Sequence, residues 1–359
     1  MAVQFMDSCD HYDQDAYITL KWNESFFGTH STASGRNGRG LNLDSTGQVS
    51  KSLSYQAGWV VGWAINIGTQ ISGTFGNDFY YQASHAGDTT LFSIYGEGDG
   101  SVSLYAGNGR HNLIQNSGTN GFFLKGGIWY WFDVKFSISG TTNMAVAAVF
   151  RVNTQTWASG SANTDINVTA LLLQQAKINF HTFHPPGSSP TGTIIDDIVI
   201  ADQSGSGAVN DFFGDTALGV LFPRADVASP TWTAVGGTTS TLFDHVNDQF
   251  AETNDDTIYI QDATAGDAAN FDWQPVSVPA GGSIIAVHYG VLARKDAEGT
   301  RSFEQTVGPS GSPTLVSPPW YPGDSYSYFF FAMDEDPATG LPWTKVGFDA
   351  TNFGVKTLT

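Results

Sequence analysis

The sequence predicts an all-β protein made of two β-sandwich domains. Its 41 glycines and its low content of charged residues, 14%, favour many short strands joined by turns. Hydrophobic residues make up 41% of the chain, which is enough to build packed cores. A chain of 359 residues is longer than one core usually serves, and at roughly 150 residues per domain it should form about two domains.

The boundary between the domains is predicted at residues 204–208, because the sequence Ser-Gly-Ser-Gly-Ala has nothing to pack into a core. This linker gives a first domain of residues 1–203 and a second, smaller domain of residues 209–359. An apolar strand at 194–200 closes the first domain and is interrupted only by Asp196 and Asp197. The acidic and aromatic segment 211–215 then opens the second domain.

Two segments are the clearest strands of the first domain. Residues 58–68 place large apolar side chains on one face and small ones, such as Gly62 and Ala64, on the other. A second layer or a ligand could therefore approach the small face closely. Residues 129–139 alternate more sharply, so one face should be core and the other, which carries Trp131 and Asp133, should face water.

Glycine-rich turns join neighbouring strands of this domain. Residues 35–40 contain three glycines but lack the GK[ST] ending and the strand–helix setting of a phosphate loop. They are therefore predicted to form a hairpin turn. The turn at 96–100 should join strands at 91–95 and 102–105.

The second domain should be a smaller β-sandwich. Clusters of Gly, Pro and Asp separate its apolar stretches, as expected of a sandwich. A short helix is expected at 166–175 in the first domain, and a short helix or turn within 241–252 in the second. The strands predicted for the second domain are residues 218–222, 257–261, 283–293, 302–307 and 325–331.

The strong negative charge limits the classes of partner. The formal net charge of −19 would repel phosphate backbones and anionic lipids, so neither nucleic acid nor a membrane is an expected partner. The single cysteine, Cys9, rules out an intrachain disulfide and a cysteine-based metal cluster. The first residues do not resemble a signal peptide, and no apolar run approaches the roughly 18 residues of a membrane span.

Several stretches, taken in order, resemble a known group of proteins. The run Trp-Tyr-Trp-Phe at 129–132 and the closing Ile-Asp-Asp-Ile at 195–198 resemble the strands of concanavalin A-like, laminin-G-like jelly rolls. Asp-Phe-Phe-Gly-Asp at 211–215 follows, and two further stretches lie at 336–344 and 352–358. Together they make nearly the whole chain similar to tailed-bacteriophage virion proteins that join such a jelly roll to a second β-domain.

The resemblance implies a concanavalin A-like jelly roll for the first domain and a structural role in a phage virion. Within the virion, the resemblance implies a capsid decoration or cement protein, or a component of the tail or a fibre. It also implies a homo-oligomer in contact with other virion proteins, because virion components occupy symmetric arrays. Such a protein would be assembled in the host cytoplasm and would act through protein–protein contacts.

The chain is predicted not to be an enzyme, because no catalytic group is evident. A glycan hydrolase with this jelly roll needs two carboxyl groups about 5 to 9.5 Å apart. The nearest match to the E-x-D-x-E pattern of such enzymes, residues 97–101, ends in Ser101 and lies in a turn. A G-x-S-x-G elbow is also missing from the sequence. Glycan hydrolysis therefore ranks third among the functions considered.

Glycan binding, by a receptor-recognition adhesin of the virion, is the alternative function. Sugars stack on exposed aromatic rings bordered by groups that form hydrogen bonds. Tyr80, Tyr81 and His85 have that make-up, and so do Trp320 and Tyr321. The plainer interpretation is that adjacent aromatic residues alternate between core and surface, which leaves one ring of each group outside. A host surface glycan is thus a candidate partner.

Asp196 and Asp197 are the candidate metal ligands. Two carboxylates at the centre of an apolar strand are costly to bury, so one could bind Ca²⁺ or cap a neighbouring loop. The alternative is that both accept hydrogen bonds from turns. No other cofactor is expected, because His181 and His184 lie three residues apart and point to opposite faces of a strand.

Overall fold

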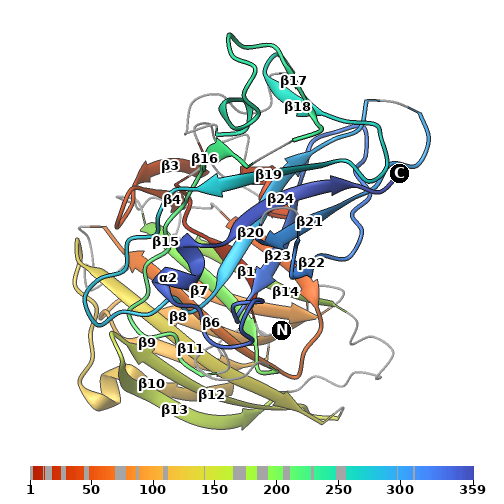
Figure 1. Ribbon diagram of the computed structural model, residues 1–359. Coiled ribbons are helices and arrows are strands. Elements are labelled where there is room, and N and C mark those ends of the chain that lie inside the picture. Colours follow the sequence, from red (N-terminus) through yellow and green to blue (C-terminus); the bar gives the residue numbers. More distant parts are fainter. Residues whose placement is uncertain are drawn as a thin grey trace. The chain divides into compact units, whose positions relative to one another are not determined.

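The computed structural model describes residues 3–10, 12, 18–25, 30–43, 48–68, 78–85, 89–107, 112–140, 142–164, 175–183, 193–204, 211–227, 230–247, 256–296, 298–309 and 312–359. The chain divides into two compact units, residues 2–218 and 219–359, which we call the N-terminal and C-terminal units. Strands dominate both units (Figure 1), which confirms the all-β prediction. Within the described ranges, no helix is long and apolar enough to cross a membrane.

The N-terminal unit contains two antiparallel sheets, as a jelly roll does. Sheet A has the strand order β13-β12-β11-β6-β15-β4-β3, and β1 also pairs with β15. Its strands are β13 (Gln155–Asn163), β12 (Ala145–Val152), β11 (Trp129–Ser139), β6 (Gly58–Asn66), β15 (Thr193–Asp202), β4 (Arg39–Leu43), β3 (His30–Ser34) and β1 (Val3–Asp7).

Sheet B has the strand order β10-β9-β8-β7-β14-β5-β2. Its strands are β10 (Asn112–Asn116), β9 (Val102–Ala106), β8 (Thr89–Gly96), β7 (Asp78–His85), β14 (Gln175–Phe183), β5 (Gln48–Ser54) and β2 (Glu24–Ser25). Within the described residues of this unit, two short helices accompany the sheets, α1 (Ile18–Lys21) and the 3-10 helix η2 (Ser117–Asn120).

Aromatic side chains from both sheets fill the core between them. Trp63 of β6 packs edge to face against Phe132 of β11, with ring centroids 5.4 Å apart, and against Phe180 of β14 at 5.5 Å. Phe92 of β8 stacks on Phe136 of β11 at 4.7 Å. The predicted heavy face of residues 58–68 is therefore the core face.

The two predicted turns are confirmed. Residues 35–38 join β3 to β4, and the Gly35 N–H donates to the carbonyl of Gly38 at 2.8 Å. The turn after β8 is closed by the Glu97 N–H, which donates to the carbonyl of Ser101 at 2.8 Å. The helix predicted at 166–175 lies outside the described residues except for Gln175, which begins β14.

Residues 211–218, which we call the strap, belong to the N-terminal unit, although the sequence assigned them to the second domain. The division into units falls after residue 218, whereas the predicted linker is 204–208, of which 205–208 lie outside the described residues. The strap is held to sheet A by hydrogen bonds: the Gly214 N–H donates to Asp133 Oδ2 at 2.8 Å.

The strap explains why one prediction about sheet A is wrong. Trp131 and Asp133 were expected to face water, but each is only 1% exposed. Gly62, opposite them on β6, allows this burial: a Cβ there would lie 2.5 Å from Trp131 and 2.9 Å from Phe213 of the strap. The close approach predicted at the small face of β6 is therefore made by the chain itself.

The outer edge of β13 is covered by amide side chains. Gln115 Oε1 of β10 accepts a hydrogen bond from the Ser159 N–H at 2.8 Å. Asn120 Nδ2 of η2 donates to the carbonyl of Trp157 at 2.6 Å. Two backbone groups of an edge strand are thereby paired with side chains from the sheet B part of the unit.

The C-terminal unit packs a two-stranded ribbon on a five-stranded sheet. The sheet order is β16-β19-β24-β21-β22, from β16 (Pro223–Asp226), β19 (Ala268–Trp273), β24 (Asn352–Thr357), β21 (Phe303–Gly308) and β22 (Leu315–Val316). The ribbon pairs β20 (Val287–Ala293) with β23 (Ser327–Met333). Tyr289, Phe331 and Phe353 join ribbon and sheet in one core. A second ribbon, β17 (Thr233–Val235) with β18 (Tyr259–Gln261), and helix α2 (Lys345–Asp349) complete it.

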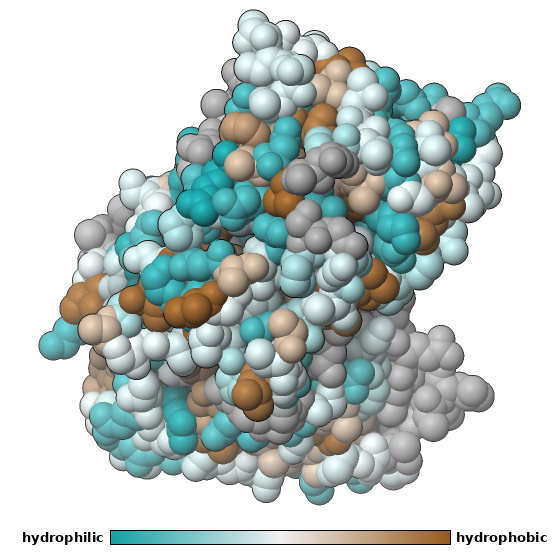
Figure 2. All heavy atoms as spheres, viewed as in Figure 1, coloured by the Kyte–Doolittle hydropathy of each residue, from teal (hydrophilic) through white to brown (hydrophobic). Residues whose placement is uncertain are grey.

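Some strands of the C-terminal unit differ from those predicted. Residues 218–222 are not a strand, and pairing begins at Pro223. β19 and the central strand β24 were not predicted. The short helix or turn expected within 241–252 is a 3-10 turn, η5 (Phe243–His245), as far as the described residues extend, since 248–252 lie outside them. Figure 2 shows hydrophobic residues as separate patches among hydrophilic ones on the viewed face.

Candidate functional site

The register of sheet B places two predicted glycan-binding positions, 80 and 81, on opposite faces of the sheet. Tyr80, Tyr81 and His85 lie on β7, and their side chains are outside the described part of the chain. Position 81 pairs with Phe180 and Ile94, both of which are buried in the core. Because successive positions of a strand alternate between faces, position 80 belongs to the outer face of sheet B.

A row of hydrogen-bonding residues crosses five strands on this outer face. The Cα register pairs Ser50 with Asn179, Asn179 with Gln82, Gln82 with Ser93, and Ser93 with Tyr105. We call these five residues the first row. None of them is aliphatic, whereas the neighbouring positions on the other face carry core residues.

A second row lies one pleat further along the same strands. The register pairs Gln48 with His181, His181 with Tyr80, Tyr80 with Tyr95, and Tyr95 with Ser103. The described side chains of the two rows, those of Ser50, Ser93, Ser103, Tyr95 and Tyr105, carry hydroxyl and phenol groups. This face differs from the outer face of sheet A, where Val60, Ala64 and Val199 are apolar and buried.

Two hydroxyl groups of the first row are buried and form no hydrogen bond with any described residue. Ser50 Oγ and Ser93 Oγ are both inaccessible to solvent, and both residues are 0% exposed. Buried polar groups are nearly always paired, so such exceptions often mark a place where a ligand or water belongs. Beside Ser93, the rings of Tyr95 and Tyr105 meet edge to face with centroids 5.6 Å apart.

The second predicted aromatic pair is divided between core and surface. Trp320 is half-buried, and its indole N–H donates to Gln305 Oε1 at 2.9 Å in the C-terminal unit. Tyr321 is 64% exposed. Tyr321 is therefore the more exposed of these two rings.

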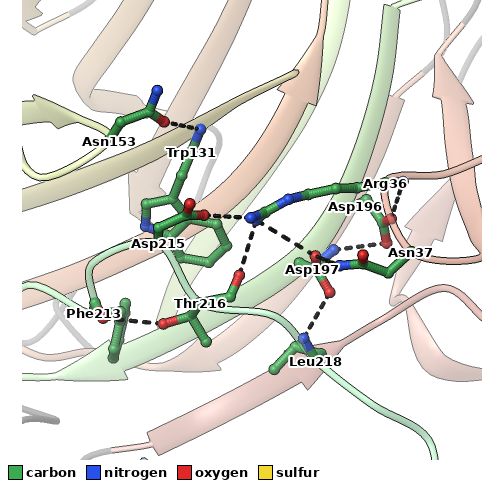
Figure 3. Close-up of polar contacts among 10 residues, drawn as sticks. All are labelled: Arg36, Asn37, Trp131, Asn153, Asp196, Asp197, Phe213, Asp215, Thr216 and Leu218. Carbon is green, nitrogen blue, oxygen red and sulfur yellow. Dashed lines mark hydrogen bonds and ion pairs between the residues drawn. The ribbon is translucent and has the colours of Figure 1, made fainter. Parts of the chain in front are cut away.

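A β-bulge in β15 positions Asp196 and Asp197. The register with β6 shifts between Asp196 and Val199, and Asp197 has a φ of 51°, a left-handed conformation that aspartate tolerates better than most residues. Both carboxylates accept backbone hydrogen bonds (Figure 3). Asp196 Oδ2 accepts from the Arg36 N–H, and Asp197 Oδ1 from the Leu218 N–H, each at 2.7 Å.

Arg36, in the turn between β3 and β4, connects that hairpin to the strap. Its guanidinium donates to the carbonyl of Thr216 at 3.1 Å and forms an ion pair with Asp215 (Figure 3). It also lies 3.8 Å from Asp197 Oδ2. Asp196, Asp197 and Arg36 thus form a clamp, which we call the aspartate clamp, between the hairpin tip at 35–38, strand β15 and the strap.

Burial shifts the ionisation of the carboxyl groups beneath and beside the strap. Loss of solvent raises the pKa of Asp196 to about 7, with repulsion from Asp197 adding to the effect. Burial likewise raises the pKa of Asp197 to about 6. The pKa of Asp133 rises to about 7 because of burial, although the hydrogen bond from Gly214 opposes the shift.

The donors around Asp196 and Asp197 favour a structural role. Both carboxylates face N–H groups, and a cation would compete with these hydrogen bonds. Among the described residues, no three His, Cys, Asp or Glu side chains are grouped as metal ligands. The sequence signalled that these carboxylates need partners, but it could not indicate Arg36 and the strap, which lie far away along the chain.

Comparisons with known proteins bear on the fold. No protein-family model and no curated protein matches the sequence. A solved alginate lyase from Aplysia kurodai is similar, with a TM-score of 0.42 and 12% identity over 56% of this chain and 99% of that one. Domain 4 of an extracellular arabinanase from Geobacillus stearothermophilus has a TM-score of 0.39 and 14% identity over 56% and 93% of the two chains. A Bacillus subtilis protein with a galectin-like fold gives 0.35 and 10% over 56% and 96%.

The comparisons correct the prediction that the chain is not an enzyme. The similar solved structures include alginate lyases and a glucuronan lyase from Trichoderma reesei. The sequence reasoning considered paired carboxylates and nucleophilic serine or cysteine residues as catalytic groups. It considered Tyr80 only for glycan binding and His181 only as a metal ligand.

Proposed function

We propose that the N-terminal unit binds a polysaccharide on the outer face of sheet B. The observation that supports this most directly is that the buried hydroxyls of Ser50 and Ser93, in one cross-strand row, form no hydrogen bond with any residue that the structure describes. A sugar hydroxyl both donates and accepts hydrogen bonds, so it can satisfy a serine hydroxyl of either orientation. The half-buried phenol ring of Tyr95, which packs on the buried ring of Tyr105 beside Ser93, is amphipathic, as suits contact with a sugar ring.

Binding should be measured with the full-length chain on a panel of neutral and uronate-containing polysaccharides. Isothermal titration gives the affinity, and the released reducing ends and unsaturated products report cleavage. Cleavage is measured because positions 80 and 181 carry a tyrosine and a histidine, residue types that transfer protons near neutral pH. Absence of binding to every polysaccharide of the panel would contradict the proposal.

Ser93→Ala separates the proposed role from stability. Removal of an unpaired buried hydroxyl should leave the free energy of unfolding unchanged or slightly increased. Glycan affinity should fall by roughly 5-fold to 10-fold if one sugar hydrogen bond of about 1 to 1.5 kcal/mol is lost. Thermal unfolding and titration of the same sample measure both quantities.

Ser117→Ala is the matched control. The Ser117 hydroxyl is also buried, but it accepts from the Val102 N–H at 2.8 Å and donates to the carbonyl of Phe122 at 3.1 Å. The substitution should lower stability by about 1 to 2 kcal/mol and leave glycan affinity unchanged. Unchanged glycan affinity in Ser93→Ala, together with reduced affinity in Ser117→Ala, would refute a sugar contact at Ser93.

The resemblance to phage virion proteins supports a second proposal, that the protein is displayed on a particle as a homo-oligomer. In the C-terminal unit, Tyr321, Leu341 and Val346 are 64%, 62% and 80% exposed. Exposed apolar and aromatic side chains suit a protein–protein contact. Sedimentation of the purified chain tests self-association, and a monomer that stays monomeric at high concentration would speak against it.

A further inference from the structure

The tip of the β3–β4 hairpin carries an Asn-Gly step. Asn37 and Gly38 are both exposed. In such a step the backbone nitrogen of the glycine can attack the side-chain amide carbon of the asparagine, because glycine has no Cβ to obstruct the approach. Nearby groups decide whether a folded protein permits this attack.

The two reacting groups of this step are weakly held. Asn37 Nδ2 reaches Asp197 Oδ2 only at 3.5 Å, the outer limit of a hydrogen bond. The Gly38 N–H donates to no acceptor among the described residues. The flanking amides are fixed instead: the Arg36 N–H donates to Asp196 Oδ2 at 2.7 Å, and the Arg39 N–H donates to Asp10 Oδ1 at 2.8 Å.

A second Asn-Gly step in the same unit serves as an internal comparison. Asn120 and Gly121 are also exposed, but both reacting groups are engaged. The Gly121 N–H donates to the carbonyl of Gly118 at 3.0 Å, and Asn120 Nδ2 donates to the carbonyl of Trp157 at 2.6 Å. The remaining Asn-Gly step, Asn108–Gly109, lies outside the described residues.

We propose that Asn37 is a site of spontaneous deamidation. The Gly38 nitrogen loses its proton to solvent and bonds to Asn37 Cγ, the Cγ–Nδ2 bond breaks, and ammonia leaves with a proton taken from water. The resulting succinimide is opened by water at either carbonyl, which gives aspartate or isoaspartate. The reaction needs only water, and no atom is oxidised or reduced.

The modification places a new carboxylate next to the aspartate clamp. Position 37 adjoins Asp197, and the backbone of Gly38 adjoins Asp10, whose Oδ1 would lie 2.0 Å from a Cβ built at that glycine. A further negative charge there repels acids that are already partly buried. Deamidation should therefore weaken the attachment of the hairpin to β15 and the strap.

Peptide mapping of the aged full-length chain tests the site. The protein is incubated warm at mildly alkaline pH, and isoaspartate is labelled with isoaspartyl methyltransferase and located by mass spectrometry. In the folded protein Asn37 should convert several-fold faster than Asn120, whereas the two should convert at similar rates in urea. Equal rates in the folded chain, or faster conversion at Asn120, would overturn the proposal.

Two charge variants test the consequence. Asn37→Asp mimics one product and should lower the Tm of the N-terminal unit and speed proteolysis within 211–218. Asn120→Asp introduces the same charge away from the aspartate clamp and should leave cleavage within 211–218 unchanged. Equal cleavage of this segment in both variants would contradict the proposed effect on the strap.

Discussion

At the scale of single residues, the N-terminal unit depends on carboxyl groups that are removed from water. Asp7 is the most heavily bonded of them. It accepts from the Tyr12 hydroxyl at 2.6 Å, from the Trp22 indole N–H at 2.7 Å and from Lys21 Nζ at 3.1 Å, and it is 1% exposed. These three donors join the first strand to the segment that contains α1.

Asp7→Ala should destabilise the unit strongly. Its removal leaves a buried ammonium group and three buried donors, the Cys9 N–H included, without their acceptor, which costs about 3 to 5 kcal/mol. Urea denaturation followed by tryptophan fluorescence measures the loss. Asp272→Ala, which breaks an exposed ion pair with Arg224, is the control and should cost under about 1 kcal/mol.

Asp133 should make the stability of the unit depend on pH. Its pKa is raised to about 7 in the folded state, above its ordinary value, so the folded protein binds the proton more tightly than the unfolded chain. This contribution to stability is present in full below about pH 4 and is lost as the pH rises towards 7. From about 1.4 kcal/mol per pKa unit, the loss is up to about 4 kcal/mol.

Asp133→Asn should flatten that dependence. An asparagine cannot ionise, yet its carbonyl oxygen can still accept from the Gly214 N–H. In denaturation experiments from pH 4 to pH 8, the free energy of unfolding of the native chain should fall relative to that of Asp133→Asn as the pH rises. Parallel curves for the two proteins would show that Asp133 does not titrate in this range.

At the scale of the elements, the strap is the part that sequence reasoning could not place. The alternation in β6 and β11 correctly identified their core faces, because alternation is a local property of a strand. Which outer face is covered depends on a contact between residues about eighty positions apart, such as Gly214 and Asp133. A pattern within one strand carries no information about such a partner.

Strand β24 was missed for a different reason. Gly354 lies at its centre and weakens the strand pattern. The structure shows why glycine is needed: a Cβ there would lie 2.3 Å from Asn270 Oδ1 and 2.4 Å from the carbonyl of Ala269. The close approach between neighbouring strands requires a glycine, and this glycine interrupts the apolar alternation by which a central strand is recognised in a sequence.

Phe213→Ala and Phe212→Ala should differ in their effects on the strap. Phe213 is 7% exposed and packs over Gly62, so its truncation should cost about 3 kcal/mol or more. Phe212 lies under the guanidinium of Arg151 at 3.8 Å, a partly exposed contact worth about 0.5 to 1 kcal/mol. Thermal unfolding of both variants checks the order, and a larger loss for Phe212→Ala would refute the described burial.

At the scale of the whole molecule, the all-β class and the presence of two units followed from composition, glycine content and length. These are averages over the chain and do not depend on single contacts. The candidate site followed only in fragments. Tyr80, which belongs to the second row, was named from the sequence. The first row could not be predicted, because its five residues lie on five different strands and only the register of sheet B aligns them.

Each unit has a core of its own, so the protein should unfold in two transitions. Trp63, Phe132 and Phe180 belong to one core, whereas Tyr289 and Phe353 belong to another. In differential scanning calorimetry, Phe353→Ala should lower only one of the two transition temperatures, and Phe213→Ala only the other. A single transition that both variants shift equally would contradict this independence.

The amide side chains along β13 restrict how copies of this chain can associate. Gln115 and Asn120 occupy backbone groups of Ser159 and Trp157 that a strand from a neighbouring molecule would need for pairing. Fibril-like stacking through this edge is thereby discouraged, even though β13 itself contains no charged residue. Strand pairing between copies at Trp157 and Ser159 would first have to break these two hydrogen bonds.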